Sequence, residues 1–120
     1  PHTSNSLWSA LNFAQACLSE GHRIHRVFFY HDAVLVANTL LAPPQDEMNL
    51  TTAWQTLGQD YNLDLCLCVA SCLRRGILND SEAQRFEKTT SNLAAGFNIS
   101  GLGQLIEASL VSDRVISFGA

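Results

Sequence analysis

The sequence predicts an α/β fold with a mostly parallel sheet, and three observations support this. The run from Leu63 to Val69 is short and almost continuously apolar, which is typical of a strand covered on both faces of a parallel sheet. The run from Ile24 to Tyr30 is rich in β-branched and aromatic residues, as a second strand would be. Stretches with the helical spacing of apolar residues lie around these runs, so strands and helices alternate along the chain.

The composition indicates one domain, 1–120, because 120 residues are enough for a single hydrophobic core. Charged residues make up 15%, against about 25% in an ordinary domain, so we expect partners to cover some apolar surface. The net charge is −4 and Arg74-Arg75 is the one adjacent basic pair, which predicts no direct binding of nucleic acid. The absence of a long apolar run and of a leader-like start predicts a cytoplasmic protein without a membrane span.

The amino-terminal half is predicted to hold three helical segments and one strand. Ser4 or Asn5 can cap the first helix, because the apolar residues that follow recur at intervals of three and four until Gly21. After it we expect, in order, a strand at 24–30, a short helix at 33–41, a proline-containing loop at 42–46 and a helix from Asn49 or Thr51 to about residue 60.

The carboxy-terminal half begins with the apolar strand at 63–68, and a short helix at 72–75 follows it and ends at Gly76. The remaining predicted elements are a helix at 79–86, a loop at 88–98, a helix at 102–110 with Ser100 as its cap, and a last strand at 114–118. Gly101 and Gly103 do not follow a strand in a phosphate-loop pattern, which argues against a nucleotide site.

Three of the four cysteines lie within seven residues, at 66, 68 and 72. Cys66 and Cys68 share a face of the predicted strand, and Cys68 lies at its carboxyl end, where reacting groups gather in α/β proteins. The amino end of the following helix and the nearby Arg74 and Arg75 favour a thiolate there. Cys68 is therefore a candidate nucleophile, and the alternative is that all three cysteines are small core residues.

Other roles for the cysteines and histidines are less well supported. The spacing C-x-C-x3-C has no second cysteine pair, which argues against structural zinc, and Cys17 lies on a predicted helix face. No cofactor is indicated. His31 and Asp32 end the first predicted strand on the same sheet edge as Cys68, so His31 is either a turn residue or a group that assists the cysteine.

The segment Leu65-x-Leu67-Cys68-Val69-Ala70-x-x-x-Arg74-Arg75-Gly76 resembles the active-cysteine segment of the DsrE/TusD family of sulfur-relay proteins. Further segments are similar to that family in the same order: Arg26 to Asp32, Pro43 to Asp46, Ala53-Trp54-Gln55, Ser91-Asn92-Leu93, Ile99 to Leu105 and Asp113-Arg114-Val115. The resemblance implies a three-layer sandwich of the DsrE type, similar to flavodoxin-like and Rossmann-like folds. It also implies a sulfurtransferase that accepts sulfane sulfur as a persulfide on Cys68 and relays it to another protein.

The same resemblance implies partners and two pathways. We expect two small paralogous subunits in a heterohexamer (TusB/TusC-like or DsrF/DsrH-like), a TusA-like sulfur donor and a TusE/DsrC-like acceptor. The pathway is 2-thiouridine modification of the tRNA wobble position, which Val36-x-Asn38, Asp46-Glu47 and Trp54-Gln55 favour, or dissimilatory sulfur oxidation. A non-catalytic scaffold subunit and a flavodoxin-like nucleotide binder are the alternatives, and the second lacks a phosphate loop.

The chain departs from the family at its beginning. Members have a further strand that leads into the position of Pro1-His2-Thr3, and this strand is absent here. A doubly wound sheet places its first strand near the middle, so we expect a gap in the centre of the sheet. Whether His31, Arg74 or Arg75 assists Cys68 is left open by the sequence.

Overall fold

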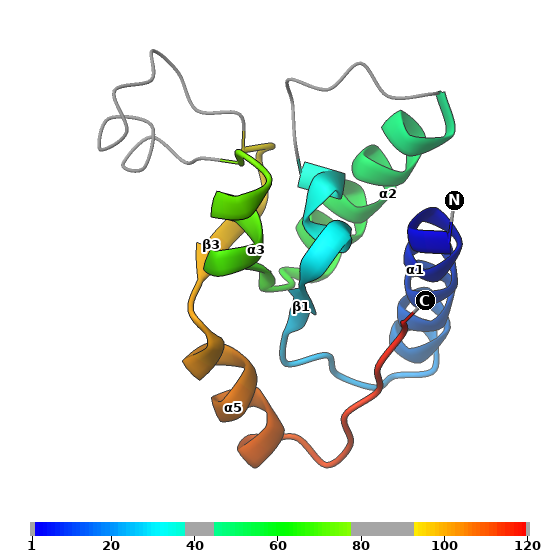
Figure 1. Ribbon diagram of the computed structural model, residues 1–120. Coiled ribbons are helices and arrows are strands. Elements are labelled where there is room, and N and C mark those ends of the chain that lie inside the picture. The colour runs from blue at the N-terminus through cyan, green and yellow to red at the C-terminus, as the bar shows by residue number, and fades with distance from the viewer. Residues whose placement is uncertain (1, 38–44, 78–92, 120) are drawn as a thin grey trace.

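Three parallel strands form the sheet in the described part of the chain, in the order β1-β2-β3 (Figure 1). The computed structural model describes residues 2–37, 45–77 and 93–119. The strands are β1 (Val27–Phe29), β2 (Leu65–Cys68) and β3 (Phe97–Ser100). Val27 lies opposite Leu65, and Cys68 lies opposite Ser100, so all three strands point their carboxyl ends to the same edge. The predicted α/β class with a parallel sheet is confirmed.

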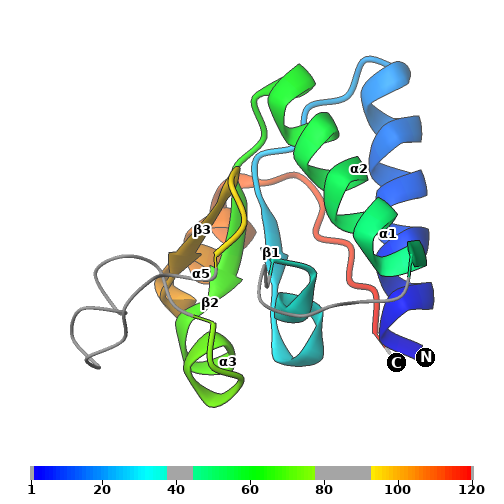
Figure 2. The same cartoon turned by 90° about the horizontal axis from the view of Figure 1, so that it is seen from above.

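Helical segments connect and cover these strands. They are α1 (His2–Ser19), the 3-10 helix η1 (His31–Ala37), α2 (Gln45–Tyr61), α3 (Val69–Arg74) and α5 (Leu102–Val111). Helix α2 packs against the sheet and α1 packs beside α2, as Figure 2 shows from above. None of the described helices is both long enough and apolar enough to cross a membrane.

The core lies between α1, α2 and one face of the sheet. Trp54 of α2 is 1% exposed, and its ring packs edge-on against Phe29 of β1 with centroids 5.2 Å apart. Gly58 lets α2 approach β2, because a Cβ at this position would lie 2.9 Å from the Leu65 Cδ1 atom. Leu65 and Leu67 face this core, so the alternating residues Asp64 and Cys66 face the other side of the sheet.

Helix α5 lies on that other side and is unlike the rest, because none of its residues is buried. The chain after it returns to α1 without regular secondary structure, and Phe118 packs on Phe13 with ring centroids 5.7 Å apart. The Ser6 hydroxyl donates a hydrogen bond to the Gly119 carbonyl at 3.2 Å. The two ends of the chain therefore lie side by side (Figures 1 and 2).

Several predicted boundaries are wrong. Helix α1 already begins at His2, so neither Ser4 nor Asn5 caps it, and α2 begins at Gln45 rather than at Asn49 or Thr51. Residues 97–100, predicted as loop and cap, form β3. The predicted strand at 114–118 is wrong, because these residues have no regular secondary structure. The predicted helix at 79–86, and parts of the short helix at 33–41 and of the loops at 42–46 and 88–98, lie outside the described residues.

The expected central gap in the sheet is also wrong. Strand β1 pairs directly with β2 in parallel register, from Val27 opposite Leu65 to Phe29 opposite Leu67. This pairing satisfies backbone groups that a gap would have left buried without partners. It also brings η1, which follows β1, next to α3, which follows β2.

Candidate active site

Cys68 is the last residue of β2, the central strand of the described sheet, and it is also the residue before the first turn of α3. Its backbone is extended, with φ −63° and ψ 123°, so the chain turns from strand to helix at this residue. Cys68 is 8% exposed, so it is largely buried but keeps some contact with solvent at the edge of the sheet. The predicted position of Cys68 at the carboxyl edge of the sheet agrees with this placement.

The surroundings of Cys68 favour its thiolate. Burial alone would raise the pKa of this thiol, but the backbone N–H and hydroxyl of Ser71, the backbone N–H of Ala70 and the charge of Arg74 outweigh it. The pKa of Cys68 therefore lies below its ordinary value. The Cys68 side chain makes no capping hydrogen bond to α3. These groups therefore stabilise the thiolate electrostatically.

Contacts of Ser71 and Arg75, both after Cys68 in the chain, fasten α3 to η1. The His31 backbone N–H donates to the Ser71 hydroxyl oxygen at 2.8 Å. Arg75 donates from Nε to the Asp32 carboxylate at 2.9 Å and from a terminal nitrogen to the Ser71 carbonyl at 3.2 Å. Two segments far apart in the sequence thus hold Ser71 in place.

The predicted site residues contribute in different ways. Arg74 is exposed and acts on Cys68 through its charge, whereas Arg75 is engaged with Asp32 and holds the two segments together. The His31 ring packs against Tyr30, with centroids 5.2 Å apart, and among the described contacts it makes no hydrogen bond with Cys68. The contact of His31 with α3 among the described residues is made by its backbone N–H, which bonds to Ser71.

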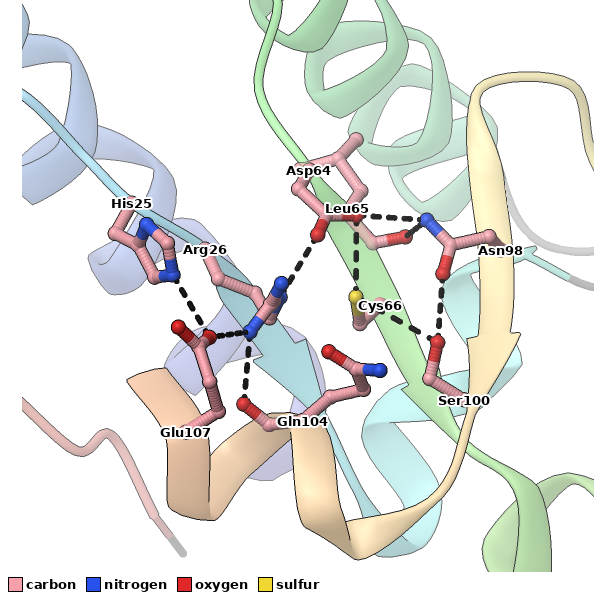
Figure 3. A network of polar contacts seen from close by, with 9 residues as sticks. All are labelled: His25, Arg26, Asp64, Leu65, Cys66, Asn98, Ser100, Gln104 and Glu107. Carbon is pink, nitrogen blue, oxygen red and sulfur yellow. Dashed lines mark hydrogen bonds and ion pairs between the residues drawn. The ribbon is translucent and has the colours of Figure 1, made fainter. Parts of the chain in front are cut away.

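Cys66 belongs to a separate polar network between the sheet and α5 (Figure 3). Its thiol donates to the Asp64 carboxylate at 3.1 Å, and Asn98 donates to the same oxygen at 2.8 Å. Burial and the neighbouring Asp64 raise the pKa of the Cys66 thiol. This thiol is therefore neutral at physiological pH and is a poor nucleophile.

Arg26 forms the other half of this network and holds α5 on the sheet. Its guanidinium donates to Asp64 at 2.7 Å, to the Gln104 carbonyl at 2.8 Å and to Glu107 at 2.7 Å. Partial burial opposes the ionisation of Asp64, but the bonds from Arg26 and Asn98 outweigh it and hold the pKa of this carboxyl below its ordinary value. His25 also contacts Glu107, at 2.9 Å. Polar contacts therefore hold α5 on the sheet, although none of its residues is buried.

The two remaining cysteines are not set up as nucleophiles in the same way. Cys72 is fully buried, and burial raises its pKa to about 12. Cys17 is half-buried on α1. All four cysteines are free thiols, and the described residues hold no group of three or more possible metal ligands.

Sequence reasoning did not identify Ser71, Asp64 or Arg26. A signal for Ser71 was present, because a hydroxyl three residues after a strand-end cysteine falls where side chains reach back across a helix start. Charged residues at the edges of the two apolar runs were the signal for Arg26 and Asp64. A depression at the other end of the sheet, near Gln59, Asn62 and Gly96, has no cysteine or charged residue in its lining.

Comparisons with known proteins find relatives over almost the whole chain. The DsrE/DsrF-like family matches residues 1–118. DsrE of Allochromatium vinosum is 45% identical over 119 residues, which cover 99% of this chain and 92% of that protein. Sulfurtransferase TusD of Salmonella dublin is 51% identical over 110 residues, covering 92% and 86% of the two chains.

A solved structure shows the same fold. The crystal structure of the ychN protein from E. coli superposes with a TM-score of 0.66 at 23% identity, and the match covers 93% of this chain and 86% of that one. Its identity is low, so it supports the fold alone. The family match and the two relatives cover almost the whole chain. The chain therefore belongs to the DsrE/DsrF-like family, and its activity class is that of a sulfurtransferase.

Proposed function

We propose that this chain carries sulfane sulfur as a persulfide on Cys68 and relays it to an acceptor protein. The observation that carries the proposal is the contrast among neighbouring thiols on β2 and α3. Only Cys68 among them combines a lowered pKa with a place at the carboxyl edge of the sheet, whereas the pKa values of Cys66 and Cys72 are raised. The thiolate is the reactive form in sulfur exchange, so this contrast selects Cys68.

The reaction consists of two exchanges that need no external oxidant or reductant. First, the Cys68 thiolate attacks the outer sulfur of a donor persulfide, so that a bond forms to Cys68 and the donor leaves as a thiolate. Second, a thiolate of the acceptor attacks the outer sulfur on Cys68, and Cys68 leaves as a thiolate again. The transferred atom keeps its oxidation state, and the site returns to its starting form.

The pathway that we propose is 2-thiouridine modification of the tRNA wobble position, and dissimilatory sulfur oxidation is the alternative. The 51% identity to relatives named TusD supports the first, and the 45% identity to DsrE keeps the second in view. We further propose that two small paralogous subunits, a TusA-like donor and a TusE/DsrC-like acceptor work with the chain in the cytoplasm. Because the chain has few basic residues, the tRNA is expected to contact another protein of the pathway.

The first test is to locate the transferred sulfur. The protein is loaded with sulfane sulfur from a donor persulfide, and each cysteine peptide is analysed by mass spectrometry for the gain of one sulfur atom. We expect the gain on Cys68, and we expect Cys68→Ser to abolish transfer to an acceptor thiol. Cys66→Ser is the matched control, two residues away on the same strand, and is expected to transfer normally.

The contrary result is equally clear. If Cys68→Ser loads and passes sulfur at the rate of the unmodified protein, Cys68 is a structural residue and another group of the chain carries the sulfur. A sulfur gain confined to Cys17, Cys66 or Cys72 would likewise refute the assignment. Retention of the far-UV circular dichroism spectrum shows that the variants are folded.

A further inference from the structure

Helix α3 follows Cys68 directly and is too short to be stable by itself. It has six residues, whereas isolated helices shorter than about 12–15 residues are marginal in water. On its strand side, Cys68 is held by the pairing of β2 with β3, in which it lies opposite Ser100. On its helix side, the orientation of Cys68 depends on what holds α3 in place.

Burial of one side of α3 does not determine how the helix is rotated. Cys72 on this side is fully buried, but apolar burial is non-directional. Directional contacts come from η1, which packs beside α3 (Figure 2). The His31 N–H donates to the Ser71 hydroxyl oxygen at 2.8 Å, and Ser71 is buried, so this bond is shielded from water.

Arg75 supplies the other directional contacts between α3 and η1. It is the residue at which α3 ends. Its Nε donates to the Asp32 carboxylate of η1 at 2.9 Å, and a terminal nitrogen donates to the Ser71 carbonyl of α3 at 3.2 Å. The Arg75 side chain is only 23% exposed. Because a guanidinium is planar and presents its donors in a rigid arrangement, these two bonds fix α3 and η1 relative to each other.

We propose that Arg75 is a positioning residue of the sulfur-transfer site, which holds α3 against η1 and so sets the orientation of Cys68. This inference rests on the proposed function of Cys68. Orientation matters for that function because exchange between sulfur atoms is fast only when the attacking group is aligned with the bond that breaks. The described side-chain bonds of Arg75 join Asp32 and Ser71, so Arg75 acts on Cys68 through α3.

The proposal makes a prediction that differs from a direct effect of charge. If α3 is loosened, the groups that favour the Cys68 thiolate move away from its sulfur, whichever partner of the ion pair is lost. These groups all belong to α3, at Ala70, Ser71 and Arg74. A direct effect of charge would instead have opposite signs, because loss of the Arg75 charge disfavours a thiolate and loss of the Asp32 charge favours it.

The experiment measures the rate of Cys68 alkylation by iodoacetamide against pH in the full chain, with the modified cysteine located by fragment-ion mass spectrometry. The midpoint of the profile reports the ionisation of Cys68, and the plateau at high pH reports its access to the reagent. Arg75→Met and Asp32→Ala are each expected to raise the midpoint by about 0.3–1 pH unit, which is a two- to ten-fold lower rate below the midpoint. The double variant should match Arg75→Met, because both substitutions break the same ion pair.

Opposite shifts in the two single variants, with the parent profile restored in the double variant, would overturn the inference, because that pattern indicates a direct effect of charge. Unchanged midpoints would overturn it as well, and so would a change confined to the plateau, which reports access alone. If Arg75→Met fails to fold by far-UV circular dichroism, the direction of the shift in Asp32→Ala still decides between the two explanations.

Other titratable groups on the elements around Cys68 are the same in the parent and in all three variants. They are His31 on η1, Asp64 and Cys66 beside and within β2, and Cys72 and Arg74 on α3; β3 has no titratable side chain. Arg23→Met and Asp60→Ala are the matched controls, since each removes the same charge from an exposed residue that precedes the amino end of a strand. Both should keep the midpoint of the parent.

The alkylation assay can fail independently of the proposed function. If sulfur loads onto Cys68 but the Arg75 and Asp32 variants keep the alkylation profile of the parent, the function stands and the role of Arg75 is wrong. If both midpoints rise but Cys68 never receives sulfur, Arg75 positions α3 as inferred and the proposed function is wrong.

Discussion

His31 has a strained backbone conformation. The energetic effect of this strain can be tested separately from any role of the imidazole. Glycine adopts a φ of 51° without steric cost, so His31→Gly should change the free energy of unfolding by at most about 1 kcal/mol, with the relief of strain offset by greater freedom in the unfolded chain. His31→Val, which is β-branched, should destabilise the protein by about 1–3 kcal/mol. Urea denaturation measures both changes. Because the described contact of His31 with α3 is made by its N–H, we expect His31→Gly to transfer sulfur normally, and a large loss would show that the imidazole takes part.

The residues of the site were predictable to different extents. Cys68 could be identified because its place at a strand end follows from the apolar run before it and from the period of two along a strand. The role of Ser71 could not, because it depends on η1 packing against α3, which is a contact between positions forty residues apart. For His31 the sequence indicated the place at the end of the strand, but not the bond of its backbone N–H to Ser71. A left-handed backbone in a residue other than glycine has no reliable sequence signal.

Close packing between α2 and β2 gives a prediction at the scale of an element. An alanine at position 58 gains about 1 kcal/mol in helix propensity, but its Cβ would lie 2.9 Å from a methyl carbon of the buried Leu65. Gly58→Ala is therefore expected to lower the free energy of unfolding by about 1–3 kcal/mol. The matched control is Gly103→Ala in α5, where nothing lies within 4 Å. It should raise stability by about 0.5–1 kcal/mol, and equal effects of the two substitutions in urea denaturation would contradict the packing argument.

The attachment of α5 should depend on pH through Asp64. Its pKa in the folded chain lies below its unfolded value, so the stabilisation is fully present above about pH 4 and is lost as the pH falls through the folded pKa. Because Asp64 anchors Arg26, which in turn bonds Gln104 and Glu107, we expect residues 102–111 to gain hydrogen-exchange rate on acidification before the core does. Asp64→Asn, which cannot titrate, should weaken this pH dependence. An unchanged pH dependence in that variant would assign the effect to Glu107, whose pKa is also lowered, by His25 and Arg26.

Elements that come with a clear local run of apolar residues were predicted well, whereas β3, which has no such run, was not. The helices at α1, α2 and α5 and the strands β1 and β2 follow from runs of apolar residues whose spacing is clear. Strand β3 has only four residues between Gly96 and Gly101, and its stability comes from pairing with β2, which no local pattern reveals. The run at 114–118 has strand-like residues but finds no neighbouring strand in the described structure. Pairing partners, rather than propensity, decide such cases.

At the scale of the whole molecule, the apolar surface of α5 is the feature that the isolated chain does not explain. Leu102, Ile106 and Leu110 recur every four residues along one side of the helix and are 57%, 58% and 80% exposed. The hydrogen bonds of Arg26 to Gln104 and Glu107 hold the opposite side of α5 on the sheet. Exposed apolar side chains in such a row are unfavourable in water, and they fit the proposed association with paralogous subunits.

Co-expression with two small paralogues of the same family should therefore yield a stable complex, and its mass can be measured by light scattering after size-exclusion chromatography. We expect Ile106→Lys to raise the dissociation constant of this complex at least ten-fold, because it would place an unpaired charge in an apolar contact. Tyr61→Lys, at a side chain 49% exposed at the end of α2, is the matched control and should assemble normally. Alkylation of Cys68 should be unchanged in both variants, since neither position contacts the groups around its sulfur. A chain that remains a monomer in the presence of its paralogues, or an Ile106→Lys variant that assembles like the parent, would show that α5 is not the contact surface.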